Sequence, residues 1–244
     1  GDIVSERTNV HTKWVYRIAA AASGEFIVTC DCYDKRVMVW HAKTLAPMQT
    51  LEGHEDGVGD VAVSPDSTMI VSSDYGGVVK VWEKQWRRWK VKRTINDHTE
   101  AVPAVAFSPD GKMLATGSTD NTIKVYSVTN DFSLMHTLEG HTDYVMSLSF
   151  SPDSTRLCSG SWDSTIKVWN PLGGSLVSEH ATSTEQVAHS PNGNLLASHD
   201  NDKNINIWQP ETMELLHTYD TSSVVHSISW SPTGPFLLSG HSDN

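Results

Sequence analysis

The sequence has little positive charge and no long apolar run. Only 18 Lys and Arg stand against 29 Asp and Glu, which gives a formal net charge of −11 at pH 7. A chain this acidic repels phosphate, so we expect no nucleic-acid partner. No apolar run approaches the roughly 18 residues of a membrane span, and residues 1–7 lack the apolar core of a signal peptide. We therefore expect no membrane partner.

Cysteine is scarce as well. The sequence has 3 Cys, of which Cys30 and Cys32 would point to the same side of a strand, and neither they nor Cys158 form a disulfide framework. The sequence contains no Asn-x-Ser/Thr acceptor for glycosylation. Both features predict a cytoplasmic location, with the nucleus as the alternative.

A repeated turn is the main feature that is present. Its prolines are 39 to 44 residues apart, at Pro65, Pro109, Pro152, Pro191 and Pro232. An eroded copy lies at residues 21–24. A histidine stands eleven residues before four of these prolines, at His54, His98, His141 and His180.

Each repeat has the pattern of strands. An apolar alternation precedes the turn, a second apolar run such as residues 113–116 follows it, and a polar tight turn at 118–121 leads to a third run at 123–126. A fourth run at 133–138 completes the unit. Four short strands in a period of about 42 residues are typical of a β-propeller blade.

The residues of one repeat resemble a known family. Gly140-His141, residues 151–153 (SPD), residues 159–163 (SGSWD) and residues 166–170 (IKVWN) look like the WD40 repeat. The resemblance implies an all-β propeller that forms a single domain over residues 1–244. It has five full blades and a partial sixth, with boundaries near 11–53, 54–97, 98–140, 141–179, 180–220 and 221–244.

The expected strands do not complete a ring. Residues 3–6 would add one outer strand before the five full blades, and the sixth blade would have only two strands. Since the family most often has seven blades, we expect the chain to be a fragment of a longer protein with a seven-bladed or larger array, in a larger chain or complex.

The resemblance also implies a buried hydrogen-bonded tetrad in each blade, in which a His, a Ser or Thr, an Asp and a Trp satisfy one another. Blade 4 would use His141, Ser159, Asp163 and Trp169, and blade 5 would use His180, Ser198, Asp202 and Trp208. In blade 2, Gly76 stands where the Asp belongs, and in blade 3, Tyr126 replaces the Trp. A His, a Ser and an Asp also suggest a catalytic triad, but a set that recurs in successive blades indicates architecture rather than catalysis.

We expect no metal site and no cofactor. Although the chain has 12 His, they show no Cys/His spacing of a zinc site. The stretch from Asp200 to Glu211 faintly resembles a calcium loop, but Ile205 occupies the place where that loop needs Gly.

The loops on the narrow face of the propeller are the predicted binding site. The positions that line this face in the family are rich in aromatic residues here, and aromatic residues often carry the energy of protein interfaces. Gly57 and Gly59 would leave room there for an inserted side chain. The candidate residues are Trp14, Tyr16, Tyr33, Tyr75, Tyr144, Met146, Trp162, Glu185, Asn201 and His226. The alternative is that these rings only pack on their neighbours.

A basic strip is the second candidate surface. Residues 84–93 hold six of the 18 basic residues, including Arg87, Arg88 and Lys90. The simpler interpretation is an outer strand that its charges protect from pairing with other chains. The functional interpretation is a docking strip for an acidic partner or for phosphate groups.

The predicted function is a non-enzymatic scaffold that binds a protein or peptide on its aromatic face. One alternative is the sensor region of a larger signalling NTPase, although this stretch has no phosphate-binding loop. A second is a hydrolase built on a propeller, for which Glu185 and His226 are the candidates at the face.

Overall fold

The computed structural model describes residue 11 and residues 15–33, 35–200 and 203–242. Within these residues the chain forms 22 β-strands, arranged as five four-stranded antiparallel sheets and one two-stranded sheet. This confirms the predicted all-β repeat architecture. The strand expected at residues 3–6 lies outside the described part. We number the sheets as blades 1 to 6 in chain order.

Every four-stranded sheet has its strands in chain order. Blades 1 and 2 are β1 (Arg17–Ala20), β2 (Phe26–Cys30), β3 (Arg36–His41), β4 (Pro47–Glu52), and β5 (Val58–Val63), β6 (Met69–Asp74), β7 (Val79–Gln85), β8 (Arg88–Ile95). Blades 3 and 4 are β9 (Ala104–Phe107), β10 (Met113–Gly117), β11 (Ile123–Ser127), β12 (Ser133–Leu138), and β13 (Val145–Phe150), β14 (Leu157–Ser161), β15 (Thr165–Asn170), β16 (Ser175–Ala181). Blades 5 and 6 are β17 (Gln186–His189), β18 (Leu196–His199), β19 (Asn204–Gln209), β20 (Glu214–Asp220), and β21 (Val225–Trp230), β22 (Leu237–His241).

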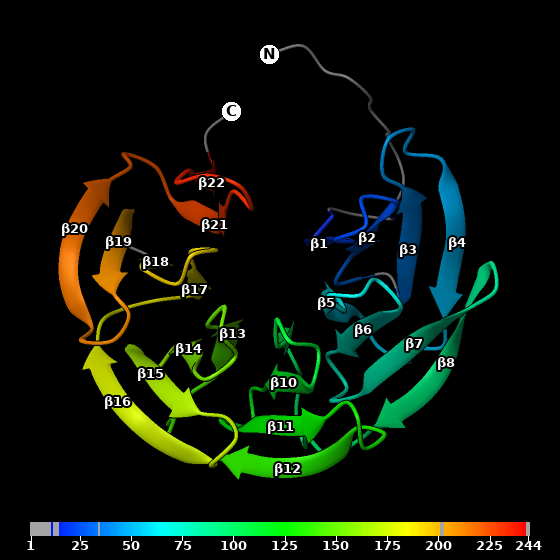
Figure 1. The fold of residues 1–244 in the computed structure, drawn as a ribbon, viewed down its shortest axis with the longest axis horizontal. Helices are drawn as coiled ribbons and strands as arrows, with labels where there is room; N and C mark the ends of the chain where they lie inside the picture. The colour runs from blue at the N-terminus through cyan, green and yellow to red at the C-terminus, as the bar shows by residue number, and fades with distance from the viewer. Residues whose placement is uncertain (1–10, 12–14, 34, 201–202, 243–244) are drawn as a thin grey trace.

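The blades stand around a common centre (Figure 1). The first strand of each blade lies towards the centre, and the fourth strands β4, β8, β12, β16 and β20 form the outer rim. Blades 1 and 6 face each other at the top of this view, where β1 pairs with β2 and β22 pairs with β21.

The hydrophobic core lies between successive blades. One cluster joins Phe26 of blade 1 to Trp82 and Trp89 of blade 2, and another joins Ala115 of blade 3 to Trp169 of blade 4. Every side chain named here is at most 5% exposed. Successive residues of a strand point to opposite faces of the sheet, so Ile70 packs with blade 1 and Val71 packs with blade 3. A blade is therefore stable only against its neighbours.

A β-bulge recurs before the large aromatic residue of the third strand. The register between third and fourth strands shifts at Val39/Trp40, Val81/Trp82, Val125/Tyr126, Val168/Trp169 and Ile207/Trp208. A bulge bends a strand and re-aims its side chains. Because the bulge recurs in all five four-stranded blades, the aromatic side chain of the third strand occupies the same position in each blade.

Candidate functional site

A chain of hydrogen bonds links the four predicted side chains of blade 4. Trp169 Nε1–H donates to Ser159 Oγ (2.8 Å), and Ser159 Oγ–H donates to His141 Nε2 (2.7 Å). His141 Nδ1–H then donates to Asp163 Oδ2 (2.7 Å). Burial lowers the pKa of His141, so the ring is neutral and has the one donor and one acceptor that the chain requires. The buried polar atoms satisfy one another, which is a structural role.

Blade 2 has the same chain of bonds and corrects one expectation. His54 Nε2 bonds with Ser72 Oγ (2.6 Å), and His54 Nδ1 bonds with Asp74 Oδ2 (2.7 Å). Trp82 Nε1 donates to Ser72 Oγ (2.8 Å). The prediction that blade 2 lacks the acid was wrong, because Asp74 supplies it from the end of β6, two residues before Gly76.

Blade 3 keeps three members of the tetrad. His98 bonds with Thr116 Oγ1 (2.7 Å) and with Asp120 Oδ2 (2.8 Å). Tyr126 occupies the place of the Trp and is fully buried. Hydrogen bonds from His98 and Thr122 hold the pKa of Asp120 well below its usual range, although burial alone would raise it.

Blade 5 departs from the prediction at its histidine. His180 lies within β16 opposite Ile166, the strand position that Leu138 occupies opposite Ile123 in blade 3. Leu138 stands fourteen residues before its turn proline, whereas His180 stands eleven before Pro191, because the connection is three residues shorter. The assignment of His180 to the tetrad was therefore wrong.

The remaining members of blade 5 are only partly described. Trp208 Nε1 donates to Ser198 Oγ (2.9 Å), as the equivalent Trp does in blade 4. The fourth predicted member, Asp202, lies outside the described residues.

The two end blades, 1 and 6, also contain a bond between a His and a hydroxyl. In blade 1, Thr29 Oγ1 bonds with His11 Nε2 (2.8 Å) and with Trp40 Nε1 (2.9 Å). In blade 6, Ser239 Oγ bonds with His241 Nε2 (2.7 Å), so the imidazole comes from the end of β22. A His–hydroxyl bond is therefore present in blades 1, 2, 3, 4 and 6, and it is buried in blades 1 to 4.

The predicted binding residues lie at the ends of strands, on the same side of each sheet. Tyr16 and Tyr144 precede the first strands β1 and β13, while Tyr33, Tyr75 and Trp162 follow the second strands β2, β6 and β14. In an antiparallel pair, the start of one strand lies beside the end of the next, so these residues lie at the same end of the strands. These five rings are 37% to 61% exposed. Trp14 and Asn201 lie outside the described residues.

Blade 4 brings two of these rings into contact. The ring centroids of Tyr144 and Trp162 are 5.2 Å apart, a distance typical of a favourable aromatic pair. A cavity of about 360 Å³ opens beside Trp162. Its lining residues are Asp143, Ser161, Trp162, Ser164, Ser183, Thr184 and Glu185. The site therefore combines an apolar surface with two half-buried carboxylates, Asp143 and Glu185, and several hydroxyls.

Met146 and His226 occupy equivalent irregular positions. The register shifts between Val145 and Ser147 in blade 4 and between Val225 and Ser227 in blade 6, and these two residues lie at the shifts. His226 is exposed, and its Nε2 bonds with Ser242 Oγ (3.1 Å). The residues that line the cavity beside Glu185 do not include His226.

A second aromatic group lies between blades 1 and 2. Burial and a hydrogen bond with Tyr16 raise the pKa of Tyr75. The guanidinium of Arg17 stacks 4.7 Å from the centroid of the Tyr16 ring. Tyr16 and Tyr75 therefore lie next to each other, with the cation of Arg17 against the Tyr16 ring.

The glycines of blade 2 do not leave space for a partner. A Cβ on Gly57 would lie 1.7 Å from the carbonyl oxygen of Cys32, and a Cβ on Gly59 would lie 3.0 Å from that of Val102. Neighbouring backbone already fills the volume that these glycines free. The expectation of an insertion site there was wrong.

Asp60 in β5 connects three segments near the centre. Its two oxygens accept hydrogen bonds from Val61 N (2.8 Å) and from Val105 N of blade 3 (2.8 Å), and Arg17 Nε of blade 1 lies 3.7 Å away. Ser147 plays a similar part between blades 4 and 5, where it accepts from Val187 N (2.7 Å). No local pattern of residues indicates these contacts.

The titration of Asp60 predicts a pH effect on stability. Burial raises its pKa to about 6, against the opposing effects of Arg17 and the two backbone N–H groups. Because the folded pKa lies above the unfolded value, this group destabilises the fold as pH rises from about 4 to about 6. The free energy of unfolding of wild type minus that of Asp60→Asn should fall by about 1–3 kcal/mol over this range. Urea unfolding at pH 4.5 and 7.5 measures this difference, and an unchanged value would show that Asp60 stays ionised throughout.

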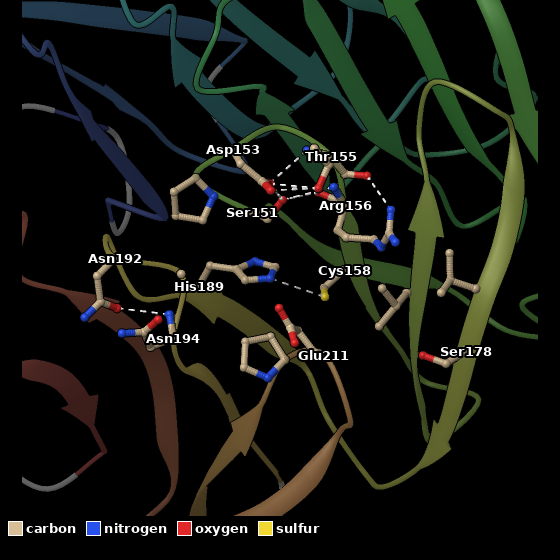
Figure 2. A pocket seen from close by; sticks show the side chains of 15 residues that line it. Ser151, Asp153, Thr155, Arg156, Cys158, Ser178, His189, Asn192, Asn194 and Glu211 are labelled. Atoms are coloured by element: carbon tan, nitrogen blue, oxygen red, sulfur yellow. Dashed lines mark hydrogen bonds between the residues drawn. The ribbon is translucent and has the colours of Figure 1, made fainter.

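A pocket between blades 4 and 5 was not predicted from the sequence. It has a volume of about 560 Å³, and Figure 2 shows Arg156, His189 and Glu211 around it. His189 Nδ1 bonds with Ser149 Oγ (3.1 Å), and its Nε2 lies 3.7 Å from Cys158 Sγ. Burial lowers the pKa of His189 to about 4 and raises that of Cys158 to about 12. The thiol is therefore protonated at neutral pH and is a poor nucleophile.

One sequence signal marks this pocket. The residue before each turn serine is Val63, Phe107, Phe150 or Trp230 in other blades, and His189 in blade 5. A polar residue at a repeated apolar position indicates a place where the packing of the blades changes.

The predicted basic strip lies on a separate surface. Arg87 is in the turn between β7 and β8, and Arg88 and Lys90 are exposed on β8 at the outer rim of blade 2. The turn between β7 and β8 lies at the opposite end of the strands from Tyr75, which follows β6.

Comparison with known families gives six matches along the chain. The WD40 family, described as "WD domain, G-beta repeat", matches residues 4–41, 45–83, 89–127, 132–170, 175–209 and 213–244. Within the described residues, no helix is long and apolar enough to cross a membrane. The same residues contain no group of three or more His, Cys, Asp or Glu that is suited to a metal ion.

Two characterised proteins are similar over part of the chain. "Superkiller complex protein 8" of Dictyostelium discoideum is 31% identical over 62 residues, which is 25% of this chain and 21% of that protein. "Small ribosomal subunit protein RACK1" of Caenorhabditis elegans is 30% identical over 83 residues, which is 30% of this chain and 26% of that protein. Each match thus spans about a quarter or less of the length of the relative.

Proposed function

The chain belongs to the WD40 repeat family, and on that premise we propose that it is a non-enzymatic scaffold that binds a protein or peptide segment at the aromatic edge of its blades. The observation that carries the proposal is the pair of Tyr144 and Trp162 beside a cavity lined by Glu185. The exposed rings supply contact area at a small cost in side-chain entropy, and the rigid strands hold their positions. The carboxylate and hydroxyls would orient polar groups of the bound segment.

The relatives support a role in assemblies. Their names place one in the superkiller complex and the other in the small ribosomal subunit. We place this chain in the cytoplasm, with the nucleus as the alternative, because Cys30, Cys32 and Cys158 are all free thiols. Free thiols suit a reducing compartment.

The variant Tyr33→Ala/Tyr144→Ala/Trp162→Ala tests the binding face. These side chains are 61%, 40% and 48% exposed, so their removal should shift the midpoint of thermal unfolding by less than about 3 °C. Binding of a partner captured by the wild type should weaken at least about tenfold, because aromatic hot spots contribute 2 kcal/mol or more.

The matched control is Tyr219→Ala, which removes a ring that is 54% exposed on the rim strand β20. It should leave both quantities unchanged. A large loss of thermal stability in the triple variant would show that these rings serve packing, and unchanged partner binding would place the binding site elsewhere.

A further inference from the structure

The β7–β8 hairpin carries an aromatic side chain that does not contribute to the core. Trp86 is 97% exposed and has a φ of +61°, in a two-residue turn between Gln85 and Arg88. A positive φ is unfavourable for a bulky side chain, and Gly normally occupies such positions in hairpins.

The equivalent turns of other blades show what offsets this backbone strain. Phe132 and Met213 also have positive φ, at 57° and 54°, between the third and fourth strands of blades 3 and 5. Their side chains are only 2% and 3% exposed and lie in the core clusters. Trp86 has the strain without the burial, and an unfavourable backbone conformation at an exposed residue points to a functional contact.

The cations around Trp86 differ from the rest of the basic strip. Three of the six form ion pairs: Lys84 with Glu25 (3.3 Å), Lys92 with Glu83 (2.5 Å) and Arg93 with Asp131 (3.4 Å). Within the described residues, the other three have no ion pair, and these are Arg87, Arg88 and Lys90. The unpaired positive charges therefore gather at the hairpin tip, in a chain whose net charge is −11.

The hairpin is firmly held next to its tip, at Trp89, which pairs with Lys84. Trp89 is 4% exposed and packs edge-on against Phe26 of blade 1, with ring centroids 5.2 Å apart. The Gln49 side chain accepts from Trp89 N (2.8 Å) and donates to Trp89 O (2.9 Å). In Figure 1 the tip reaches past β4 at the outer rim. Because Trp89 is held in place, the adjacent tip loses less conformational entropy when it binds a partner.

We propose that the tip of the β7–β8 hairpin is a second docking surface, which binds an acidic protein segment that provides an apolar pocket for Trp86. Trp and Arg are the residues most enriched at interface hot spots, and here a Trp is directly followed by two Arg. Carboxylates of the partner pair with Arg87, Arg88 and Lys90, while repulsion by the rest of this acidic chain directs the partner to the tip. This surface is independent of the aromatic face proposed above.

A random 12-residue peptide library displayed on phage is the probe. It is selected on the wild-type chain after depletion on the variant Arg87→Glu/Arg88→Glu/Lys90→Glu. The expected peptides contain several Asp or Glu around an apolar cluster. A labelled synthetic peptide from this selection should lose at least about tenfold in affinity with Trp86→Ala or the triple variant, as measured by fluorescence anisotropy. Salt at about 0.5 M should weaken it further, because exposed charges are screened.

The matched control is Lys43→Glu/Lys112→Glu/Lys203→Glu, which changes the net charge equally at exposed sites elsewhere. It should bind the peptide as the wild type does, and so should Tyr144→Ala/Trp162→Ala. Equal losses in the two charge variants, or no enrichment of acidic peptides, would overturn the proposal. Binding to phosphatidylserine vesicles or to a 12-nucleotide oligo(U) RNA that is tighter and depends on Trp86 would also overturn it, in favour of a lipid or RNA partner.

Discussion

Ser159→Ala is expected to destabilise the protein by about 2–4 kcal/mol, because it leaves two buried polar atoms without partners. Ser159 Oγ accepts from Trp169 Nε1 (2.8 Å) and donates to His141 Nε2 (2.7 Å), and it is fully buried. For a chain of this size, each kcal/mol lowers the midpoint of thermal unfolding by about 2–4 °C. Scanning calorimetry and urea unfolding measure the change.

Two other variants separate the contributions of the tetrad. Ser198→Ala in blade 5 removes the bond from Trp208 (2.9 Å) without a His180 partner, so its cost should be only about 1–2 kcal/mol. Ser159→Thr should be close to wild type, because Thr29 bonds with both the His and the Trp in blade 1, and Thr116 bonds with the His in blade 3. Equal costs for the two alanine variants would show that the His141 bond contributes nothing.

The repeat explains why the fold was predictable and the tetrads only in part. Strand positions follow from apolar alternation and from a turn that recurs every 39 to 44 residues, so small shifts do not change the architecture. A tetrad member has to fall at one position, and a connection three residues shorter moved His180 into β16. In blade 2, an Asp two residues after the hydroxyl residue replaced the expected one.

A signal for that second acid position was present in the sequence. Asp31, Asp74 and Asp200 each stand two residues after the hydroxyl residue of their blade. All three are buried. By contrast, the bond between Asp60 and Val105 N joins residues 45 positions apart. It depends on how one blade is rotated against the next, and no local pattern encodes that rotation.

The glycines of blade 2 test how closely the blades must approach. Gly57→Ala should be strongly destabilising, by about 3 kcal/mol or more, because the new Cβ would lie 1.7 Å from Cys32 O and 2.6 Å from Cys32 C. These are backbone atoms, so relief requires blade 1 to move from blade 2. Gly59→Ala meets Val102 O at 3.0 Å and should cost about 1 kcal/mol. In Gly76→Ala the new Cβ would lie 3.4 Å from Asp74 Oδ1 and 3.7 Å from Asp56 Cβ, both side-chain atoms at ordinary contact distance, so the variant should stay within about 0.5 kcal/mol of wild type.

The same series links packing to binding. Gly57 O accepts the hydrogen bond from Tyr75 N (3.0 Å), and Cys32 directly precedes Tyr33, so a shift at Gly57 separates two rings of the proposed binding face. Gly57→Ala should therefore lose affinity for the captured partner even at temperatures where it remains folded, whereas Gly59→Ala and Gly76→Ala should retain it. Urea unfolding gives the order of stabilities, and a binding titration at 10 °C gives the order of affinities. If Gly57→Ala were as stable as Gly76→Ala, the blades would not be in the close contact on which the spacing of Tyr33 and Tyr75 depends.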